Sequence, residues 1–108
     1  MYDILTLNKI SQIGLKELDE KYTITDCCDC PDGIIVRSAA MHEYAFSDKT
    51  VAVARAGAGV NNIPVEECTK KGVVVFNTPG ANANAVKELV ICSLFLASRK
   101  VVAATDWC

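Results

Sequence analysis

The chain has 108 residues, of which 51% are hydrophobic and 22% charged, and its formal net charge is −2. This length predicts one compact domain, and the slightly acidic balance without a basic run argues against nucleic acid as the main partner. Residues 1–5 lack the features of a signal peptide, and the longest apolar stretch, residues 89–97, is far shorter than the ~18 residues of a membrane span. We therefore expect a soluble, cytoplasmic domain.

The first half of the sequence predicts three strands and one helix. Residues 2–7 and 22–26 are typical of strands, the second at a sheet edge because of its polar content. Between them Ser11 is placed to cap a helix. The apolar stripe of this helix is expected at Ile13, Leu15, Leu18 and Tyr22. Residues 33–37 contain a continuous apolar run, which predicts a buried strand.

The second half alternates strand and helix again. Residues 41–47 fit a single helical turn, and residues 50–54 and 73–76 are typical of strands. A short helix over residues 64–71 is predicted between these strands, because Pro64 suits a helix start and Gly72 suits a helix end.

A long helix is expected from about residue 82 or 84 towards Trp107. Its centre, residues 89–97, is apolar on nearly every face, and such a helix requires burial all round. A five-stranded sheet with few helices does not bury a terminal helix in this way. We therefore expect a partner against it, either a further domain of the same polypeptide or a second subunit.

Six cysteines are present, and three of them, Cys27, Cys28 and Cys30, form one cluster. A structural zinc site usually combines two paired half-sites, whereas here the other cysteines are scattered and His42 is the single histidine. A disulfide framework belongs to secreted proteins. We interpret the cysteines as reduced thiols, with metal binding by the cluster as the less favoured alternative, and we assign no metal ligand.

The alternation of strands and helices predicts an α/β fold, a flavodoxin-like doubly wound parallel sheet of about five strands. Three loops then meet at the carboxyl edge of the sheet, at residues 37–38, 55–61 and 77–82. The guanidinium groups of Arg37 and Arg55 suit a phosphate or a carboxylate, and the start of the long helix adds partial positive charge. The sequence therefore predicts a site for a small anionic ligand.

Three stretches of the chain carry a family resemblance. They read Arg-Ala-Gly-Ala-Gly-Val-Asn-Asn-Ile-Pro from Arg55, Lys-Gly-Val-Val-Val-Phe-Asn-Thr-Pro-Gly-Ala-Asn from Lys71, and Val-Lys-Glu-Leu from Val86. Together with Val36-Arg37-Ser38 they resemble D-isomer-specific 2-hydroxyacid dehydrogenases over essentially the whole chain. Within this family the resemblance is greatest to the branch that acts on a small phosphorylated hydroxy acid with NAD. It implies that residues 1–108 are the N-terminal part of the substrate-binding (catalytic) domain, and that the NAD-binding domain is absent from this chain.

The resemblance also implies roles for individual residues. The substrate site would comprise Arg37, Ser38, Arg55, Ala58, Gly59 and Asn82. Of these, Arg37, Ser38 and Asn82 match positions that hold the phosphate, and the backbone at Ala58 and Gly59 matches the turn that receives the carboxylate. Arg55 matches an arginine found in one branch of the family, and Ala58 departs from branches with a hydroxyl residue there. Val60 matches the loop that faces the nicotinamide end of the cofactor.

The chain lacks the family's catalytic arginine, glutamate and histidine, which lie further along the polypeptide, so we assign no catalytic residue. Gly57-Ala58-Gly59-Val60-Asn61-Asn62 is not a dinucleotide-binding fingerprint, because Asn62 stands where the third glycine belongs and no long helix follows at once. His42 precedes these motifs and is expected at the surface. The chain alone is therefore predicted to have no dehydrogenase turnover.

Other functions are compatible with the same fold. A receiver domain requires clustered acidic residues and a flavodoxin requires a hydroxyl-rich loop after the first strand, but here that loop is Asn8-Lys9. A reductase of glyoxylate, hydroxypyruvate or another 2-oxo acid, and a non-enzymatic ligand-binding relative, remain as alternatives. Arg37 and Asn82 discriminate among these, because a phosphate role makes phosphorylated ligands depend on Arg37 more than unphosphorylated ones.

Overall fold

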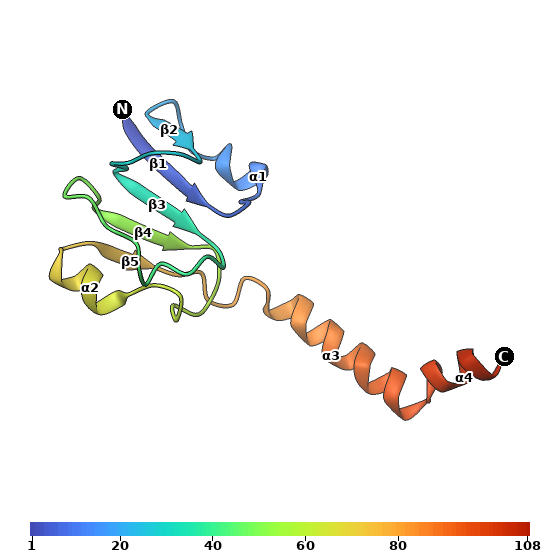
Figure 1. Cartoon of the computed structure of the whole chain (residues 1–108). Helices are drawn as coiled ribbons and strands as arrows, with labels where there is room; N and C mark the ends of the chain where they lie inside the picture. The colour runs from blue at the N-terminus through green and yellow to red at the C-terminus, as the bar shows by residue number, and fades with distance from the viewer.

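A computed structural model describes all of residues 1–108 as a five-stranded parallel sheet from which a helical arm extends (Figure 1). The strands are β1 (Tyr2–Leu7), β2 (Tyr22–Thr25), β3 (Gly33–Val36), β4 (Ala52–Arg55) and β5 (Val74–Phe76). Their order is β2-β1-β3-β4-β5, and every neighbouring pair is parallel. This is the flavodoxin-like order, so the predicted fold class is confirmed and β2 is an edge strand as expected.

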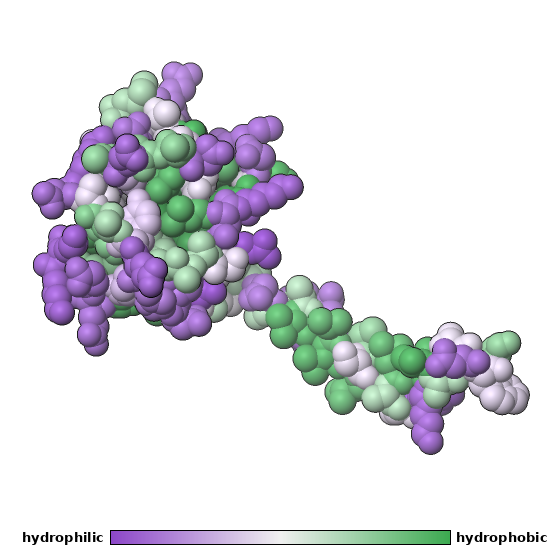
Figure 2. Space-filling model, in the orientation of Figure 1, coloured by the Kyte–Doolittle hydropathy of each residue, from purple (hydrophilic) through white to green (hydrophobic).

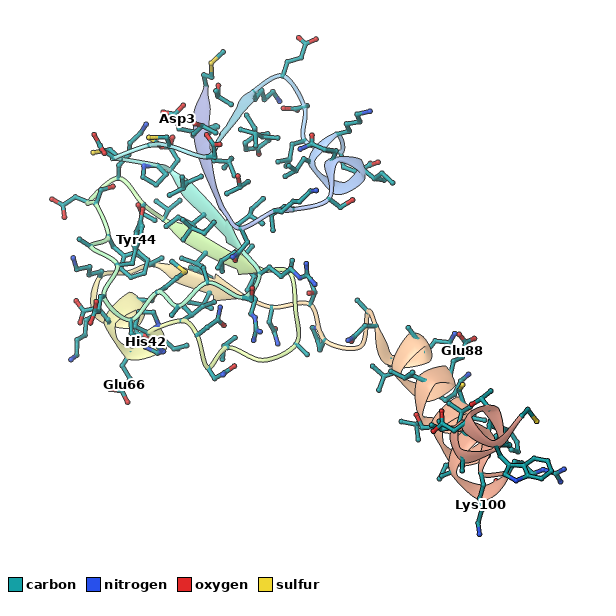
Figure 3. All side chains as sticks on the ribbon, turned by 45° about the vertical axis from the view of Figure 1, so that its right-hand side comes forward. Asp3, His42, Tyr44, Glu66, Glu88 and Lys100 are labelled. Atoms are coloured by element: carbon teal, nitrogen blue, oxygen red, sulfur yellow. The ribbon has the colours of Figure 1, made fainter.

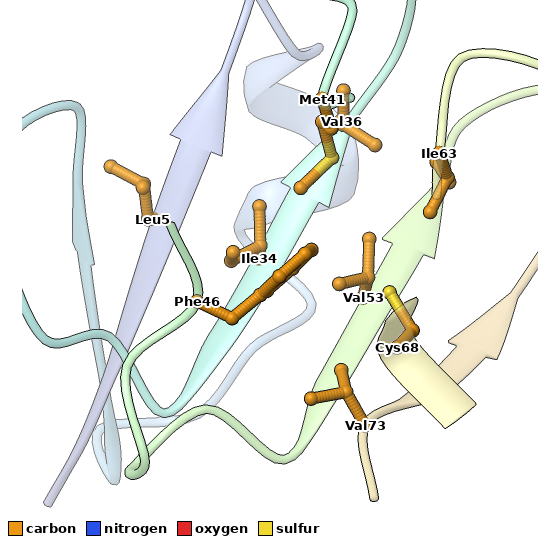
Figure 4. Close-up of a cluster of buried hydrophobic side chains, with 9 residues drawn as sticks. All are labelled: Leu5, Ile34, Val36, Met41, Phe46, Val53, Ile63, Cys68 and Val73. Atoms are coloured by element: carbon orange, nitrogen blue, oxygen red, sulfur yellow. The ribbon is translucent and has the colours of Figure 1, made fainter. Parts of the chain in front are cut away.

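The hydrophobic core lies on one face of this sheet (Figure 4). The strand register places Leu5 beside Ile34 and Ile34 beside Val53, so these three side chains form a continuous apolar row. The buried cluster comprises Leu5, Ile34, Val36, Met41, Phe46, Val53, Ile63, Cys68 and Val73. Each large side chain in it contributes about 1.5–3 kcal/mol by leaving water.

The opposite face of the sheet is only partly covered. Leu18, in the turn after the first helix, lies with Ile4 and Ile35 around a shallow cavity on this face. Towards β5 nothing covers the sheet, and Val74 and Phe76 are 53% and 57% exposed. The sheet is therefore well covered on its core face and only partly covered on the opposite face.

The first helix is much shorter than predicted. Helix α1 spans Gln12–Leu15, a single turn, and Ser11 lies at its N-cap without donating or accepting a side-chain hydrogen bond there. Gly14 weakens the helix by roughly 0.5–1 kcal/mol relative to alanine. The Asp19 carboxylate then accepts a hydrogen bond of 2.9 Å from the backbone N–H of Lys21, which closes a turn into β2. Of the predicted apolar stripe only Leu15 is a buried residue of the helix: Ile13 is 80% exposed, Leu18 lies after the helix, and Tyr22 belongs to β2, which was also predicted from the sequence.

Residues 41–47 form no helix, which corrects that prediction. A single hydrogen bond of 3.0 Å runs from the backbone N–H of Tyr44 to the carbonyl of Met41, and the chain then continues irregularly. Met41 and Phe46 are both buried against the sheet. The backbone of this segment therefore follows the positions at which these two side chains are buried and does not form a helix.

Helix α2 spans Val65–Lys70, so the predicted helix exists with slightly narrower bounds. Pro64 lies at its N-cap rather than inside the helix, and Gly72 ends it with φ +71°, a conformation that favours glycine. Strand β4 begins two residues later than expected, and just before it the Thr50 hydroxyl donates a hydrogen bond of 2.8 Å to the carbonyl of Pro31.

The predicted long C-terminal helix is two helices, α3 (Ala83–Ser98) and α4 (Val101–Trp107). Lys100 separates them in the left-handed conformation, with φ +51°, and lies at the bend of the arm (Figure 3). No residue of either helix is buried, and the surface of α3 is largely apolar (Figure 2). Neither these helices nor α1 and α2 combine the length and apolarity needed to cross a membrane.

Candidate functional site

Three loops meet at the carboxyl edge of the sheet, as predicted: residues 37–40 after β3, residues 56–62 after β4 and residues 77–82 after β5. Backbone hydrogen bonds join them. The N–H of Ala56 donates to the carbonyl of Val36 at 2.8 Å, and the N–H of Thr78 donates to the carbonyl of Gly57 at 2.9 Å. The Asn77 amide donates to the carbonyl of Ala58 at 2.7 Å. The middle loop is thus held from both sides.

Arg55 cross-links the first two loops. Its Nε donates a hydrogen bond of 2.9 Å to the carbonyl of Arg37, and its Nη1 donates to the carbonyl of Gly59. Nη1 also lies 3.4 Å from Oδ1 of Asn61, while Nη2 has no hydrogen-bond partner. Two of the five N–H donors of the guanidinium thus bind backbone carbonyls, a third faces Asn61, and the two on Nη2 have no partner within the protein.

The two glycines of the middle loop are explained by this guanidinium. A Cβ atom at Gly57 would lie 3.3 Å from Nε of Arg55, and one at Gly59 would lie 3.0 Å from Nη1 and 3.2 Å from Oδ1 of Asn61. Neither glycine has a positive φ. These positions are therefore small because the Arg55 side chain lies across the loop.

Arg37 and Ser38 follow β3 and are both exposed. Their side chains form no hydrogen bond or ion pair within the protein, and no salt bridge of the chain involves Arg37 or Arg55. The positive charge of both guanidinium groups is thus not neutralised by any carboxylate. Such an edge favours an anion over a cation or a neutral ligand.

The backbone N–H groups of Ala58, Gly59 and Val60 also lack partners within the protein. The carbonyls of these residues are engaged instead, by the Asn77 amide at Ala58, by Arg55 at Gly59 and by the backbone N–H of Ile63 at Val60. The loop therefore offers free N–H donors beside the Arg55 guanidinium, an arrangement suited to a carboxylate or phosphate oxygen.

Asn82 lies at the N-cap of α3 and is exposed. Its side chain caps nothing, and no hydrogen bond joins it to Arg37 or Ser38. Hydrogen bonds thus join the loops of Arg37, Arg55 and residues 58–60, whereas Asn82 stands at the start of the arm without a hydrogen bond to the other two loops.

Several polar residues that organise this edge were not singled out by sequence reasoning. Asn8, at the end of β1, accepts hydrogen bonds through Oδ1 from the backbone N–H groups of Arg37, Ser38 and Ala39, at 3.2, 3.0 and 2.8 Å. The sequence feature that could have indicated this role is the position of Asn8, a polar residue directly after a central strand. Asn62 donates a hydrogen bond of 2.8 Å to the carbonyl of Ala39, and its Oδ1 is buried without a partner.

His42 is exposed, as expected, and its Nε2 lies 2.9 Å from the carbonyl of Asn61, so an N–H at this nitrogen donates to it. All six cysteines are free thiols, and burial raises the pKa of the Cys68 thiol. No group of three or more histidine, cysteine, aspartate or glutamate side chains is arranged to hold a metal ion.

Comparison with known proteins relates this architecture to one family. The model of the D-isomer specific 2-hydroxyacid dehydrogenase catalytic domain matches residues 4–106. D-3-phosphoglycerate dehydrogenase from Rattus norvegicus is 37% identical over 105 residues, and the enzyme of that name from Mycobacterium tuberculosis is 38% identical over 76 residues. These alignments include 94% and 68% of this chain but only 20% and 14% of the relatives.

A solved structure shows the same fold. It is described as cofactor (NAD+) bound 3-phosphoglycerate dehydrogenase of Entamoeba histolytica, with a TM-score of 0.69 and 29% sequence identity. The match covers 88% of this chain and 38% of that one. Of the mammalian relatives that it matches, the chain spans about a fifth of the length.

Proposed function

From the fact that the chain belongs to the D-isomer specific 2-hydroxyacid dehydrogenase family, we propose the following function. Residues 1–108 form the N-terminal part of the substrate-binding domain of an NAD-dependent D-3-phosphoglycerate dehydrogenase. Such an enzyme oxidises 3-phosphoglycerate to 3-phosphohydroxypyruvate and opens serine biosynthesis. The names of the mammalian and mycobacterial relatives support this choice of substrate over an unphosphorylated acid.

The observation that carries the proposal is the surplus of unpaired donors at one edge of the sheet. The Arg37 guanidinium, the Ser38 hydroxyl and the free N–H groups at Ala58 and Gly59 have no partner within the protein. The Arg55 cross-link joins the loops that carry them. A ligand with an anionic group at each end satisfies both sets of donors, and 3-phosphoglycerate has a phosphate and a carboxylate.

Each residue then has a role in binding. Arg37 and Ser38 hold the phosphate, and Asn82 adds its amide from the start of α3. The N–H groups of Ala58 and Gly59 receive the carboxylate, supported by the neighbouring charge of Arg55. Because Ala58 has no hydroxyl, this position contributes only its backbone.

The residues present do not fit NAD as a complete site. Gly57 and Gly59 make room for the Arg55 guanidinium and do not open a helix, and a turn separates them from α2. We propose that a further domain binds most of the cofactor and that Val60, half-buried in the middle loop, faces its nicotinamide end. We accordingly expect pure chain mixed with NAD and 3-phosphoglycerate to form no NADH, measured by absorbance.

The arm is the proposed contact to that further domain. Leu89, Leu94 and Phe95 on α3 are 65–68% exposed, and no side chain of α3 is buried. An apolar helix of this kind gains stability only when another surface covers it. A cofactor domain is the proposed partner, and a second subunit is the alternative occupant.

The proposed phosphate role is tested by Arg37→Ala. Binding of 3-phosphoglycerate and of D-glycerate to the 108-residue chain is compared by calorimetric titration. We expect the variant to lose about 10- to 100-fold in affinity for 3-phosphoglycerate, the magnitude of a charge-assisted hydrogen bond. D-glycerate, which lacks the phosphate, is expected to bind the variant and the unaltered chain alike.

Arg99→Ala is the matched control, because Arg99 is an exposed arginine on the arm, outside the three loops. It should leave the affinity for both ligands unchanged. Equal weakening of the two ligands by Arg37→Ala would contradict a phosphate site. It would favour a family member that acts on an unphosphorylated acid, such as a glyoxylate or hydroxypyruvate reductase.

A further inference from the structure

Three consecutive backbone N–H groups, those of Arg37, Ser38 and Ala39, converge on one point of the molecule. Such a concave set of amides is a nest, which proteins commonly use to bind an anionic oxygen from a ligand. Here the occupant is internal, because Oδ1 of Asn8 accepts all three hydrogen bonds at 3.2, 3.0 and 2.8 Å.

The backbone of Asn8 is adapted to this contact. Its φ is +86°, in the left-handed region, where asparagine and aspartate are enriched among residues other than glycine. The Asn8 amide nitrogen forms no hydrogen bond within the protein, so only the oxygen of the side chain is used. The requirement at this position is therefore for an acceptor and for tolerance of a positive φ.

The carbonyl side of the same loop is also occupied. Arg55 Nε donates to the carbonyl of Arg37 at 2.9 Å, and the Asn62 amide donates to the carbonyl of Ala39 at 2.8 Å. Arg37 and Ala39 thus have both their backbone N–H and their carbonyl engaged. The Arg37 and Ser38 side chains, by contrast, are unpaired and exposed.

We propose that Asn8 is a positioning residue for recognition of the ligand phosphate. By filling the nest, Asn8 excludes a ligand anion from the backbone of residues 37–39 and fixes the loop so that Arg37 and Ser38 contact the phosphate through their side chains. The inference rests on the proposed function and names the residue that determines which groups of the loop bind phosphate.

Two variants separate the acceptor from the backbone conformation. Asn8→Gly adopts the positive φ without strain but has no acceptor, whereas Asn8→Asp keeps an acceptor and tolerates the same φ. Hydrogen exchange of the amides of residues 37–39 is measured by NMR on the 108-residue chain without ligand. Exchange should accelerate roughly 5- to 10-fold in Asn8→Gly and stay near the unaltered rate in Asn8→Asp.

Ligand titrations supply the second readout. Asn8→Gly should weaken 3-phosphoglycerate about tenfold and D-glycerate less than twofold. Asn8→Asp is used for the exchange measurement alone, because its carboxylate adds a negative charge beside the phosphate site. A general loss of structure would weaken both ligands and would lower the thermal unfolding midpoint, which is measured for each variant.

The outcomes distinguish this inference from the proposed function. If the unaltered chain binds no 3-phosphoglycerate, the proposed function fails, and the phosphate role of Asn8 fails with it. If the chain binds 3-phosphoglycerate and Asn8→Gly binds it equally well, only the role of Asn8 is overturned. The role of Asn8 is also overturned if the amides of residues 37–39 exchange as slowly in Asn8→Gly as in the unaltered chain. The same holds if they exchange as fast in Asn8→Asp as in Asn8→Gly.

Discussion

The side chain of Arg55 connects two loops that are separated by about twenty residues of sequence, and it does so through backbone carbonyls. A lysine has a single ammonium group and does not span these acceptors with the fixed fork of a guanidinium. The neighbouring glycines follow from the same contact. At the scale of single residues, the candidate site is thus a set of free donors held by an internal framework of Asn8, Arg55, Asn62 and Asn77.

The role of the glycines is tested by Gly59→Ala. The added Cβ would lie 3.0 Å from Nη1 of Arg55 and displaces the guanidinium from its carbonyl partners. We expect the free energy of unfolding to fall by about 1–3 kcal/mol, measured by urea denaturation.

Gly14→Ala is the matched control, because a Cβ there meets nothing within 4 Å and Gly14 lies in helix α1. This variant should be more stable than the unaltered chain by about 0.5–1 kcal/mol. The explanation of Gly59 is wrong if both substitutions stabilise the protein equally.

At the scale of elements, the starts of three central strands are joined by charge. The Asp32 carboxylate, just before β3, accepts a hydrogen bond of 2.7 Å from the backbone N–H of Asp3 in β1. It also lies 3.0 Å from Nζ of Lys49, which precedes β4, and Lys49 lies 3.2 Å from Asp3 (Figure 3 labels Asp3). The hydrogen bond from Asp3 and then the Lys49 ammonium lower the pKa of Asp32 below its usual 3.8.

This cluster predicts a loss of stability in acid. Because the pKa of Asp32 is lower in the folded state than in the unfolded state, its contribution to stability is present above pH 3.8 and disappears as pH falls through the folded value. We expect the urea concentration at the unfolding midpoint to decrease when the pH is lowered below about 4. Asp32→Asn should reduce this dependence of the midpoint on pH. Asp48→Asn, at an exposed residue without an ion pair, should leave the profile unchanged.

The sequence predicted the strands and helix α2 well and the other helices poorly, for physical reasons. Short β-branched runs such as Ile34-Ile35-Val36 favour buried parallel strands, and the order of the elements then determined that three loops meet at one edge. Helix lengths depended on tertiary contacts and single backbone conformations, such as the left-handed Lys100 that ends α3. Arg37, Ser38 and the 58–60 loop were placed at the edge from strand ends. The part played by Asn8 depends on a side-chain contact across 29 to 31 residues, which no local pattern contains.

At the scale of the whole molecule, the chain exposes far more surface than a compact protein of its mass. Its accessible surface is 8074 Å², against about 5,800 Å² expected from the mass. The radius of gyration is 19.1 Å, against about 13 Å for a compact domain of this length. The excess, about 2,300 Å² on this chain alone, is larger than the roughly 800 Å² that one partner contributes to a standard protein interface.

Independence of the arm from the sheet is tested by Leu94→Glu. Leu94 is 65% exposed, so the substitution should change the free energy of unfolding by less than about 0.5 kcal/mol and should reduce binding of an apolar fluorescent dye. Ile34→Ala, in the core, should cost about 2–5 kcal/mol. Strong destabilisation by Leu94→Glu would show that α3 packs against the sheet in solution.

The most direct test of the central claim is an amide chemical-shift map of the 108-residue chain titrated with 3-phosphoglycerate. We predict that the largest shifts fall on Arg37, Ser38, Ala58, Gly59 and Asn82, and that D-glycerate moves the 58–59 amides while leaving Arg37 and Ser38 nearly unchanged. Shifts that lie away from these loops, or that are the same for both ligands, would contradict a phosphate-recognising substrate site at this edge of the sheet.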